Sequence, residues 1–109
     1  MLVRFVSSET AEVLMFAEVA KMLLQVVGKE STARGVFTQP EMLDAARLLR
    51  EAVKRAEAEP SVEEEEDEAT GRKQPVVAFG QRAWPLIDML ERTARGKDAS
   101  ITWEAPAAF

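Results

Sequence analysis

The sequence has no histidine, no cysteine and no tyrosine among its 109 residues. Their absence removes the imidazole base, the thiolate nucleophile, the phenolic acid and every zinc or iron site built from nitrogen and sulfur ligands. The carboxylates, lysines, arginines, serines and threonines that remain show no recognisable catalytic constellation. We therefore favour a non-enzymatic protein, with no catalytic residues, no cofactor and no bound metal.

A long apolar run is also missing. No stretch approaches the about 20 apolar residues that a membrane-spanning helix needs, and the apolar stretch in residues 1–7 is too short for a signal peptide. Without cysteine there is no disulfide, which suits a reducing compartment. From a mass of 12.1 kDa we expect one domain, cytoplasmic and without a membrane partner.

Positive charge is nowhere concentrated. The net charge is −5, but residues 57–68 hold eight acidic and no basic residues, whereas the remainder has 11 acidic and 14 basic residues. Acidic and basic residues are interleaved outside that segment, which argues against nucleic-acid binding. Nucleic-acid binding by the basic remainder, gated by the acidic segment, is the hypothesis that we rank last.

The acidic residues fall in a segment with almost no apolar side chains, residues 59–75. This composition is typical of a flexible linker. We expect a domain over residues 1–104 that this linker interrupts, followed by a tail at 105–109.

Apolar periodicity predicts two strands and three helices. The expected strands are 2–7 and 99–104, and the expected helices are 9–27, 38–57 and 76–95. A capping box from Thr38 to Glu41 starts the second helix. Gly80 and Pro85 interrupt the third, so we expect a kink or two pieces, with a strand over 76–79 as the alternative. The fold class is α+β, with three helices packed on a small sheet formed by the N- and C-terminal strands.

A two-stranded sheet is only marginally stable by itself. Both faces of the strand at 2–7 carry apolar residues, and the helix at 9–27 has a wider apolar arc than a surface helix needs. These features predict a homodimer, in which association extends the sheet or pairs the first helices.

Trp84 is the first candidate site residue. At 100° per residue it falls with Asp88 and Glu91, away from the apolar face of the third helix. An exposed Trp84, with Arg82 nearby, favours a protein-interaction or regulatory module that binds an unknown protein partner. The alternative is that the break at Pro85 changes the phase and buries Trp84 against the first helix.

A second hypothesis is the binding of a small anionic molecule. This hypothesis includes an enzyme whose catalytic groups are carboxylates and an arginine. Arg82 would clamp the anion in the bend around Gly80, with Gln81 and Asp88 beside it. The alternative is a structural pairing of Arg82 with Asp88 or a helix carbonyl.

Three segments carry a resemblance to a known family: residues 1–7, 28–30 and, above all, 81–90, which contain Arg-Ala-Trp-Pro. The chain resembles a family of small proteobacterial proteins of unknown function across nearly its whole length. The resemblance implies a stand-alone cytoplasmic protein with no assigned activity, cofactor or catalytic residue.

Overall fold

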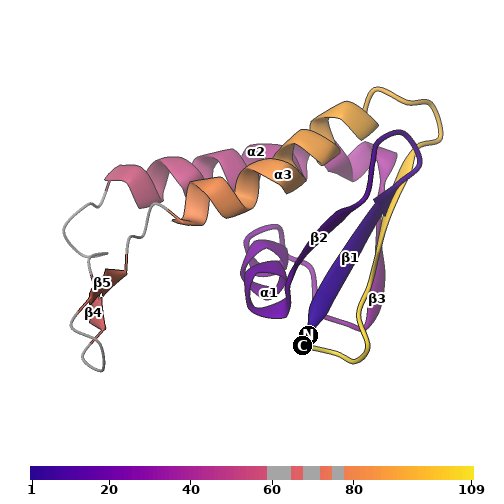
Figure 1. The fold of residues 1–109 in the computed structure, drawn as a ribbon. Helices are drawn as coiled ribbons and strands as arrows, with labels where there is room; N and C mark the ends of the chain where they lie inside the picture. The colour runs from indigo at the N-terminus through magenta and orange to yellow at the C-terminus, as the bar shows by residue number, and fades with distance from the viewer. Residues whose placement is uncertain (59–64, 68–71, 75–77) are drawn as a thin grey trace.

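The computed structural model describes residues 1–58, 65–67, 72–74 and 78–109. Within these residues, three helices pack on one face of a four-stranded antiparallel sheet (Figure 1). The elements in chain order are β1 Leu2–Ser7, β2 Val13–Phe16, α1 Ala17–Val26, β3 Arg34–Thr38, α2 Gln39–Ala58, β4 Glu65–Asp67, β5 Arg72–Gln74, α3 Ala78–Thr93 and β6 Ser100–Glu104. The α+β class predicted from the sequence is confirmed.

The N- and C-terminal strands lie side by side in the middle of this sheet. The strand order is β2-β1-β6-β3, and each neighbouring pair is antiparallel. In the register, Trp103 of β6 lies opposite Phe5 of β1 on one side and opposite Gly35 of β3 on the other. The two ends of the chain lie close together (Figure 1). The predicted meeting of the terminal strands in one sheet is therefore confirmed.

The first helix is shorter than predicted, because its expected first turns include a strand. α1 begins at Ala17, and residues 13–16 form β2, which pairs with β1. All four residues of β2 are apolar, so their sequence fits a helical stripe and a strand equally well. The pairing with β1 decides between the two. The prediction of a helix over 9–27 is wrong before Ala17.

The second strand that was not predicted is β3, at the other edge of the sheet. Phe37 is the only one of its five side chains that is fully buried. One buried apolar residue gives too weak an alternation to identify a strand from sequence. The sheet therefore has four strands where two were predicted.

The helix α2 starts where its capping box predicts. The Thr38 hydroxyl donates to a Glu41 carboxylate oxygen at 2.7 Å, and the same carboxylate accepts from the Thr38 backbone N–H. The second contact is the half of a capping box in which the N3 carboxylate satisfies the backbone N–H of the N-cap residue. α2 then continues to residue 58, one residue beyond the predicted end.

The helix α3 runs unbroken from Ala78 to Thr93, with Pro85 inside it. The prediction of two pieces is wrong, and so is the alternative strand at 78–79; residues 76 and 77 lie outside the described residues. Pro85 is exposed, so its ring does not disturb the core, and its missing N–H leaves only the Gln81 carbonyl without an intrahelical donor. None of the described helices is long and apolar enough to cross a membrane.

The core lies between the three helices and the inner face of the sheet. Its completely buried side chains include Val3, Phe5, Leu23, Leu24, Phe37, Met42, Leu49, Leu86, Ile87, Leu90 and Ile101. Trp103 packs at its centre, with its ring 6.3 Å from that of Phe5 and 5.5 Å from that of Phe37 between centroids. This arrangement leaves the outer face of the sheet and the outer sides of the helices free to carry a site.

The structure describes part of the predicted linker, residues 59–75. Its β4 and β5 pair as a separate two-stranded sheet near the far end of α2 and α3 (Figure 1). The rest of the segment lies outside the described residues, so the linker and the domain boundaries stay predictions. In the predicted tail, 105–109, two backbone N–H groups donate to carbonyls of the loop before β3.

Candidate interaction surface

Trp84 lies at the surface, with 43% of its area exposed. It projects from the side of α3 that faces away from the buried residues of that helix, where its sequence phase puts it. The alternative, burial against the first helix, is not what the structure shows. An exposed tryptophan is unusual enough to require a closer account of what surrounds it.

Arg50 of α2 covers part of the Trp84 ring. The guanidinium carbon lies 4.9 Å from the ring centroid, within the range of a cation–π interaction. The same guanidinium forms two hydrogen bonds to the Glu91 carboxylate, at 2.6 and 2.7 Å. Glu91 is seven residues after Trp84, so both lie on one side of α3, two turns apart. Arg50 therefore bridges α2 and α3 and touches both residues.

The charges of this bridge are mutually stabilised. The hydrogen bonds from Arg50 hold the pKa of the Glu91 carboxyl below its ordinary value, against a smaller opposing effect of burial. The same contact raises the pKa of the Arg50 guanidinium. A bidentate pair fixes the guanidinium plane, and so it also fixes what lies over the Trp84 ring. We name Trp84, Arg50 and Glu91 the Trp84 cluster.

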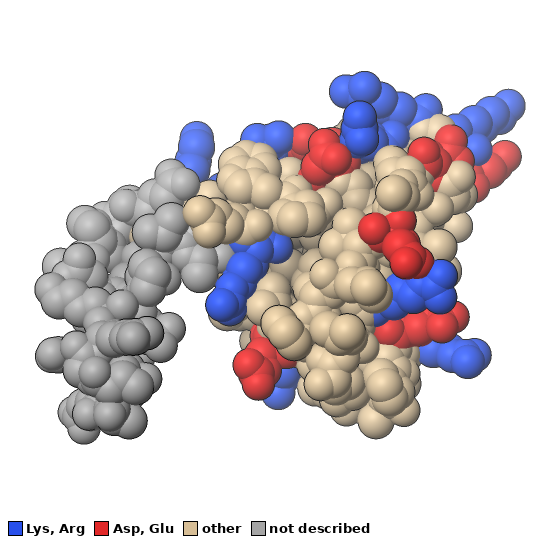
Figure 2. All heavy atoms as spheres, viewed as in Figure 1, with Lys and Arg blue, Asp and Glu red and all other residues tan. Residues whose placement is uncertain are grey.

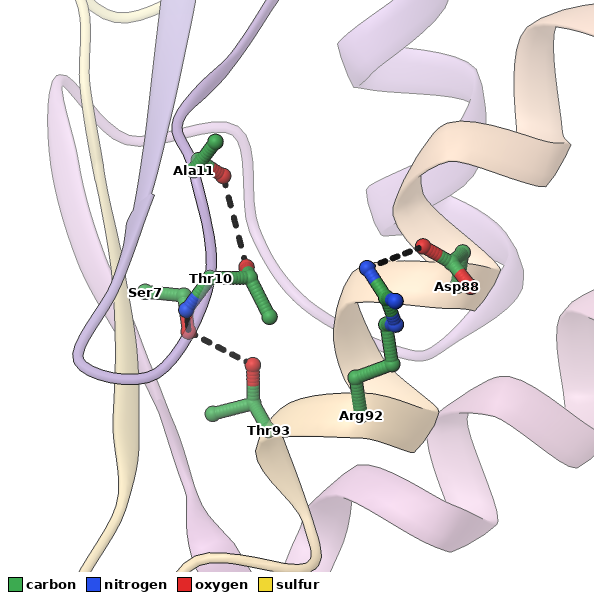
Figure 3. Close-up of polar contacts among 6 residues, drawn as sticks. All are labelled: Ser7, Thr10, Ala11, Asp88, Arg92 and Thr93. Atoms are coloured by element: carbon green, nitrogen blue, oxygen red, sulfur yellow. Dashed lines mark hydrogen bonds and ion pairs between the residues drawn. The ribbon is translucent and has the colours of Figure 1, made fainter.

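The structure does not bring the other predicted site residues together. Gln81, Arg82 and Asp88 are all exposed on α3. Arg82 is two residues before Trp84 and six before Asp88, so it points to a different side of the helix from either. Asp88 pairs with Arg92 at 3.7 Å, one turn along the same helix (Figure 3). Their roles in binding a partner or an anion stay predictions.

A second polar group joins the end of β1 to the end of α3. The hydroxyls of Ser7 and Thr93 are buried and lie 2.6 Å apart (Figure 3). Ser7 Oγ also accepts from the backbone N–H groups of Glu9 and Thr10, at 2.9 and 3.1 Å. Both acceptor positions of Ser7 are then used, so Ser7 donates its own proton to Thr93. The pair thus ties the end of β1 to the end of α3.

Sequence reasoning missed an exposed apolar patch at the β1–β2 end of the sheet, where Leu2, Leu14 and Phe16 lie on the outer face. Its members are Met1, Leu2, Leu14 and Phe16, which are exposed by 54, 49, 55 and 67%. In the register, Leu2 of β1 lies opposite Phe16 of β2. The sequence signal for it was weak, because residues 13–16 are all apolar and fit a helical stripe as well as a strand. We name these four residues the β2 patch.

Acidic side chains do not gather into a metal site in the described part of the chain, where no group of three such residues is suitably placed. The candidate surfaces of this structure are therefore the Trp84 cluster and the β2 patch.

Residues 1–103 match a protein family described as a domain of unknown function, DUF1840. The match runs from the start of β1 to the last but one residue of β6, so it includes both candidate surfaces. The searches of curated proteins and of solved structures gave no match.

Proposed function

This chain belongs to the DUF1840 family of domains of unknown function, and we propose that it is a non-enzymatic interaction module that binds a protein partner through Trp84. We also propose that it acts in the cytoplasm. We propose in addition that the family is proteobacterial and that the Arg-Ala-Trp-Pro segment is characteristic of it.

One observation carries the proposal: an exposed tryptophan is held in place by an arginine that is itself fixed. Trp84 is 43% exposed, Arg50 lies over its ring, and Glu91 holds Arg50 with two hydrogen bonds. Tryptophan and arginine are the side chains that most often dominate the binding energy of an interface. Because the cluster is already ordered, binding costs less side-chain entropy.

The chemistry of the cluster indicates the kind of surface that it fits. The open part of the indole requires an apolar pocket, in which burial removes its remaining exposed area from water. The charge of Arg50 is already neutralised by Glu91. Lys54, one helical turn further along α2, is exposed and can pair with a carboxylate of the partner. We therefore expect the partner to offer an apolar pocket with at least one carboxylate on its rim.

The test compares Trp84→Ala with Leu43→Ala. Leu43 is a matched control, because it is a large apolar residue of α2 with 60% of its area exposed. The unmodified chain is used to capture proteins from the organism that encodes it, and the captured protein is identified, purified and titrated by calorimetry against the unmodified chain and both variants. We expect Trp84→Ala to weaken binding by about tenfold or more, as for a hot-spot residue, and Leu43→Ala to leave the affinity unchanged.

Thermal melts of both variants separate binding from folding. A Trp84→Ala variant that binds as tightly as the unmodified chain would contradict the proposal. So would a loss of binding that accompanies unfolding of the variant, because Trp84 would then serve the fold. Retained folding together with lost binding is the outcome that supports an interaction site.

A further inference from the structure

The two edges of the four-stranded sheet differ in how their backbone groups are occupied. At the β3 edge, the Val36 carbonyl accepts a hydrogen bond from Lys29 Nζ at 3.1 Å, and the Arg34 carbonyl accepts one from the Thr32 hydroxyl at 2.6 Å. Lys29 is itself held by an ion pair with Glu41. Side chains of the same molecule thus block this edge, a common protection against the addition of a further strand.

Among the described residues, no side chain occupies the backbone groups of the β2 edge in this way. The Ala17 N–H donates to the Met1 carbonyl at 2.9 Å, which sets the alternation of the β1–β2 ladder. The backbone groups of Val13 and Met15 therefore point to β1, and those of Leu14 and Phe16 point away from it. In the described part of the chain, no hydrogen bond reaches the N–H and C=O of Leu14 or the N–H of Phe16.

Exposed apolar side chains adjoin this open edge. Leu14 and Phe16, 55 and 67% exposed, stand on the outer face directly beside the open backbone groups, and Leu2 continues the patch onto β1. The space-filling view shows a tan surface over the region of β2 and the chain termini, with charged side chains at its borders (Figure 2). An edge with open backbone groups and apolar side chains is suited to pairing with another strand.

We propose that the β2 edge pairs with the β2 edge of a second copy of this chain, antiparallel and about a two-fold axis. A strand edge that offers both the N–H and the C=O of Leu14 is complementary to itself in this arrangement. The register that places Leu14 opposite Leu14 of the second copy lets the two residues exchange both hydrogen bonds, and it brings the two apolar patches together. The result is a continuous eight-stranded sheet, and the inference is independent of the function proposed for Trp84.

The blocked β3 edge explains why association stops at two copies. If both edges were open, the β3 edge of one copy could pair with the β2 edge of the next, and further copies would add to form a filament. With Lys29 and Thr32 on the β3 carbonyls, only β2-to-β2 pairing is left, and that pairing uses up both open edges. The geometry therefore selects a closed dimer rather than an open assembly.

The first test is the mass in solution, by native mass spectrometry and light scattering at micromolar concentration. We expect twice the chain mass of 12.1 kDa for the unmodified chain. Leu14→Pro removes an outward N–H and leaves the ladder to β1 intact, a change that edge strands tolerate. It should yield a monomer. Val36→Pro makes the same change at the blocked edge and should remain a dimer.

A second pair of variants removes the side chains instead of the backbone donor. Phe16 is the N-cap residue of α1 and provides no side-chain cap, so Phe16→Ser removes apolar surface while adding a preferred N-cap. This variant should be a folded monomer. Leu43→Ser removes an equally exposed apolar residue from α2 and should remain a dimer.

Each other outcome overturns the inference. A monomeric unmodified chain excludes the dimer, and an assembly larger than two copies excludes closure. If the dimer persists in both Leu14→Pro and Phe16→Ser, the two copies associate through another surface. The same conclusion follows if Val36→Pro dissociates the dimer. Circular dichroism tests whether each variant is folded. If Leu14→Pro is unfolded, the oligomeric state of Phe16→Ser tests the proposed dimer interface.

Discussion

The indole ring of Trp103 lies directly on the backbone of Gly35, its cross-strand partner. The indole N–H donates to the Thr32 carbonyl at 2.9 Å, which fixes the ring over the glycine. An aromatic ring that covers a glycine on the neighbouring strand protects a weak point of a sheet.

Gly35→Ala should destabilise the fold, because the added Cβ would overlap the Trp103 ring. Overpacking of this kind costs about 1–3 kcal/mol, and more where backbone must move. Gly28→Ala is a useful contrast: nothing lies within 4 Å of its added Cβ, but its φ is +78°, so it costs about 1 kcal/mol from backbone strain alone. Urea unfolding measures both variants, and a Gly35→Ala variant no less stable than Gly28→Ala would contradict the contact.

Thr93→Val should destabilise the fold although it preserves the shape of the side chain. It leaves the buried Ser7 hydroxyl without the acceptor that lies 2.6 Å away, and an unsatisfied buried polar group costs about 1–3 kcal/mol. Thr102→Val is the control, since Thr102 is exposed on β6 and its substitution should be nearly neutral. Equal stabilities of the two variants in urea would mean that the Ser7–Thr93 bond contributes nothing.

Stability should fall on acidification below the ordinary carboxyl pKa of 4.5. Burial raises the pKa of Glu41, but hydrogen bonds from Lys29 and Thr38 outweigh it and keep that pKa low; Arg50 lowers the pKa of Glu91. A carboxyl with a lower pKa in the folded state stabilises the fold above its unfolded pKa and loses this effect as pH falls through the folded value.

The measurement is urea unfolding at a series of pH values from 7 downwards. Glu41→Gln and Glu91→Gln should each reduce the loss of stability below pH 4.5, because each removes one of the protons taken up on unfolding. Glu51→Gln is the control, because the exposed Glu51 carboxylate pairs with Arg47 of the same helix, α2. An unchanged pH dependence in both test variants would contradict the assignment.

The sequence was sufficient for the fold class, because the two terminal strands and α2 have clear periodicity and a capping box. It failed at residues 13–16, where four apolar residues fit both periods and only the pairing with β1 selects the strand. It also could not show that α3 passes through Pro85, since burial of the opposite side of that helix decides the matter. Long-range pairing is the information that local periodicity does not contain.

The candidate surfaces divide in the same way. The phase of α3 put Trp84 on the polar side of the helix, but the break expected at Pro85 left its burial open, and only the structure shows that it is exposed. Arg50 was not predicted as its neighbour, because that contact depends on how α2 and α3 lie against each other. The β2 patch was missed because Leu14 and Phe16 were assigned to a helix. Assigning the helical period to residues 13–16 therefore missed both the strand β2 and the exposed surface that it forms.

The cover that Arg50 provides for Trp84 can be measured by fluorescence quenching with acrylamide. The two tryptophans differ in exposure, 43% for Trp84 and 3% for Trp103, so a neutral quencher acts mainly on Trp84. Arg50→Ala should increase quenching and shift emission to the red, because it exposes the ring to water. Glu91→Gln should have a smaller effect in the same direction, since Arg50 remains but loses the charged partner that orients it.

Arg47→Ala is the matched control, because Arg47 is an exposed arginine of α2 whose ion pairs are with Asp44 and Glu51. Quenching as in the unmodified chain is expected for this variant. Trp84→Phe should abolish most of the quenching, which verifies the assignment of the signal. If Arg50→Ala leaves quenching unchanged, Arg50 does not cover the ring in solution, and the ordered cluster on which the proposed function rests does not exist. If quenching rises as expected, the indole is held by Arg50, and partner binding can be followed through the same signal.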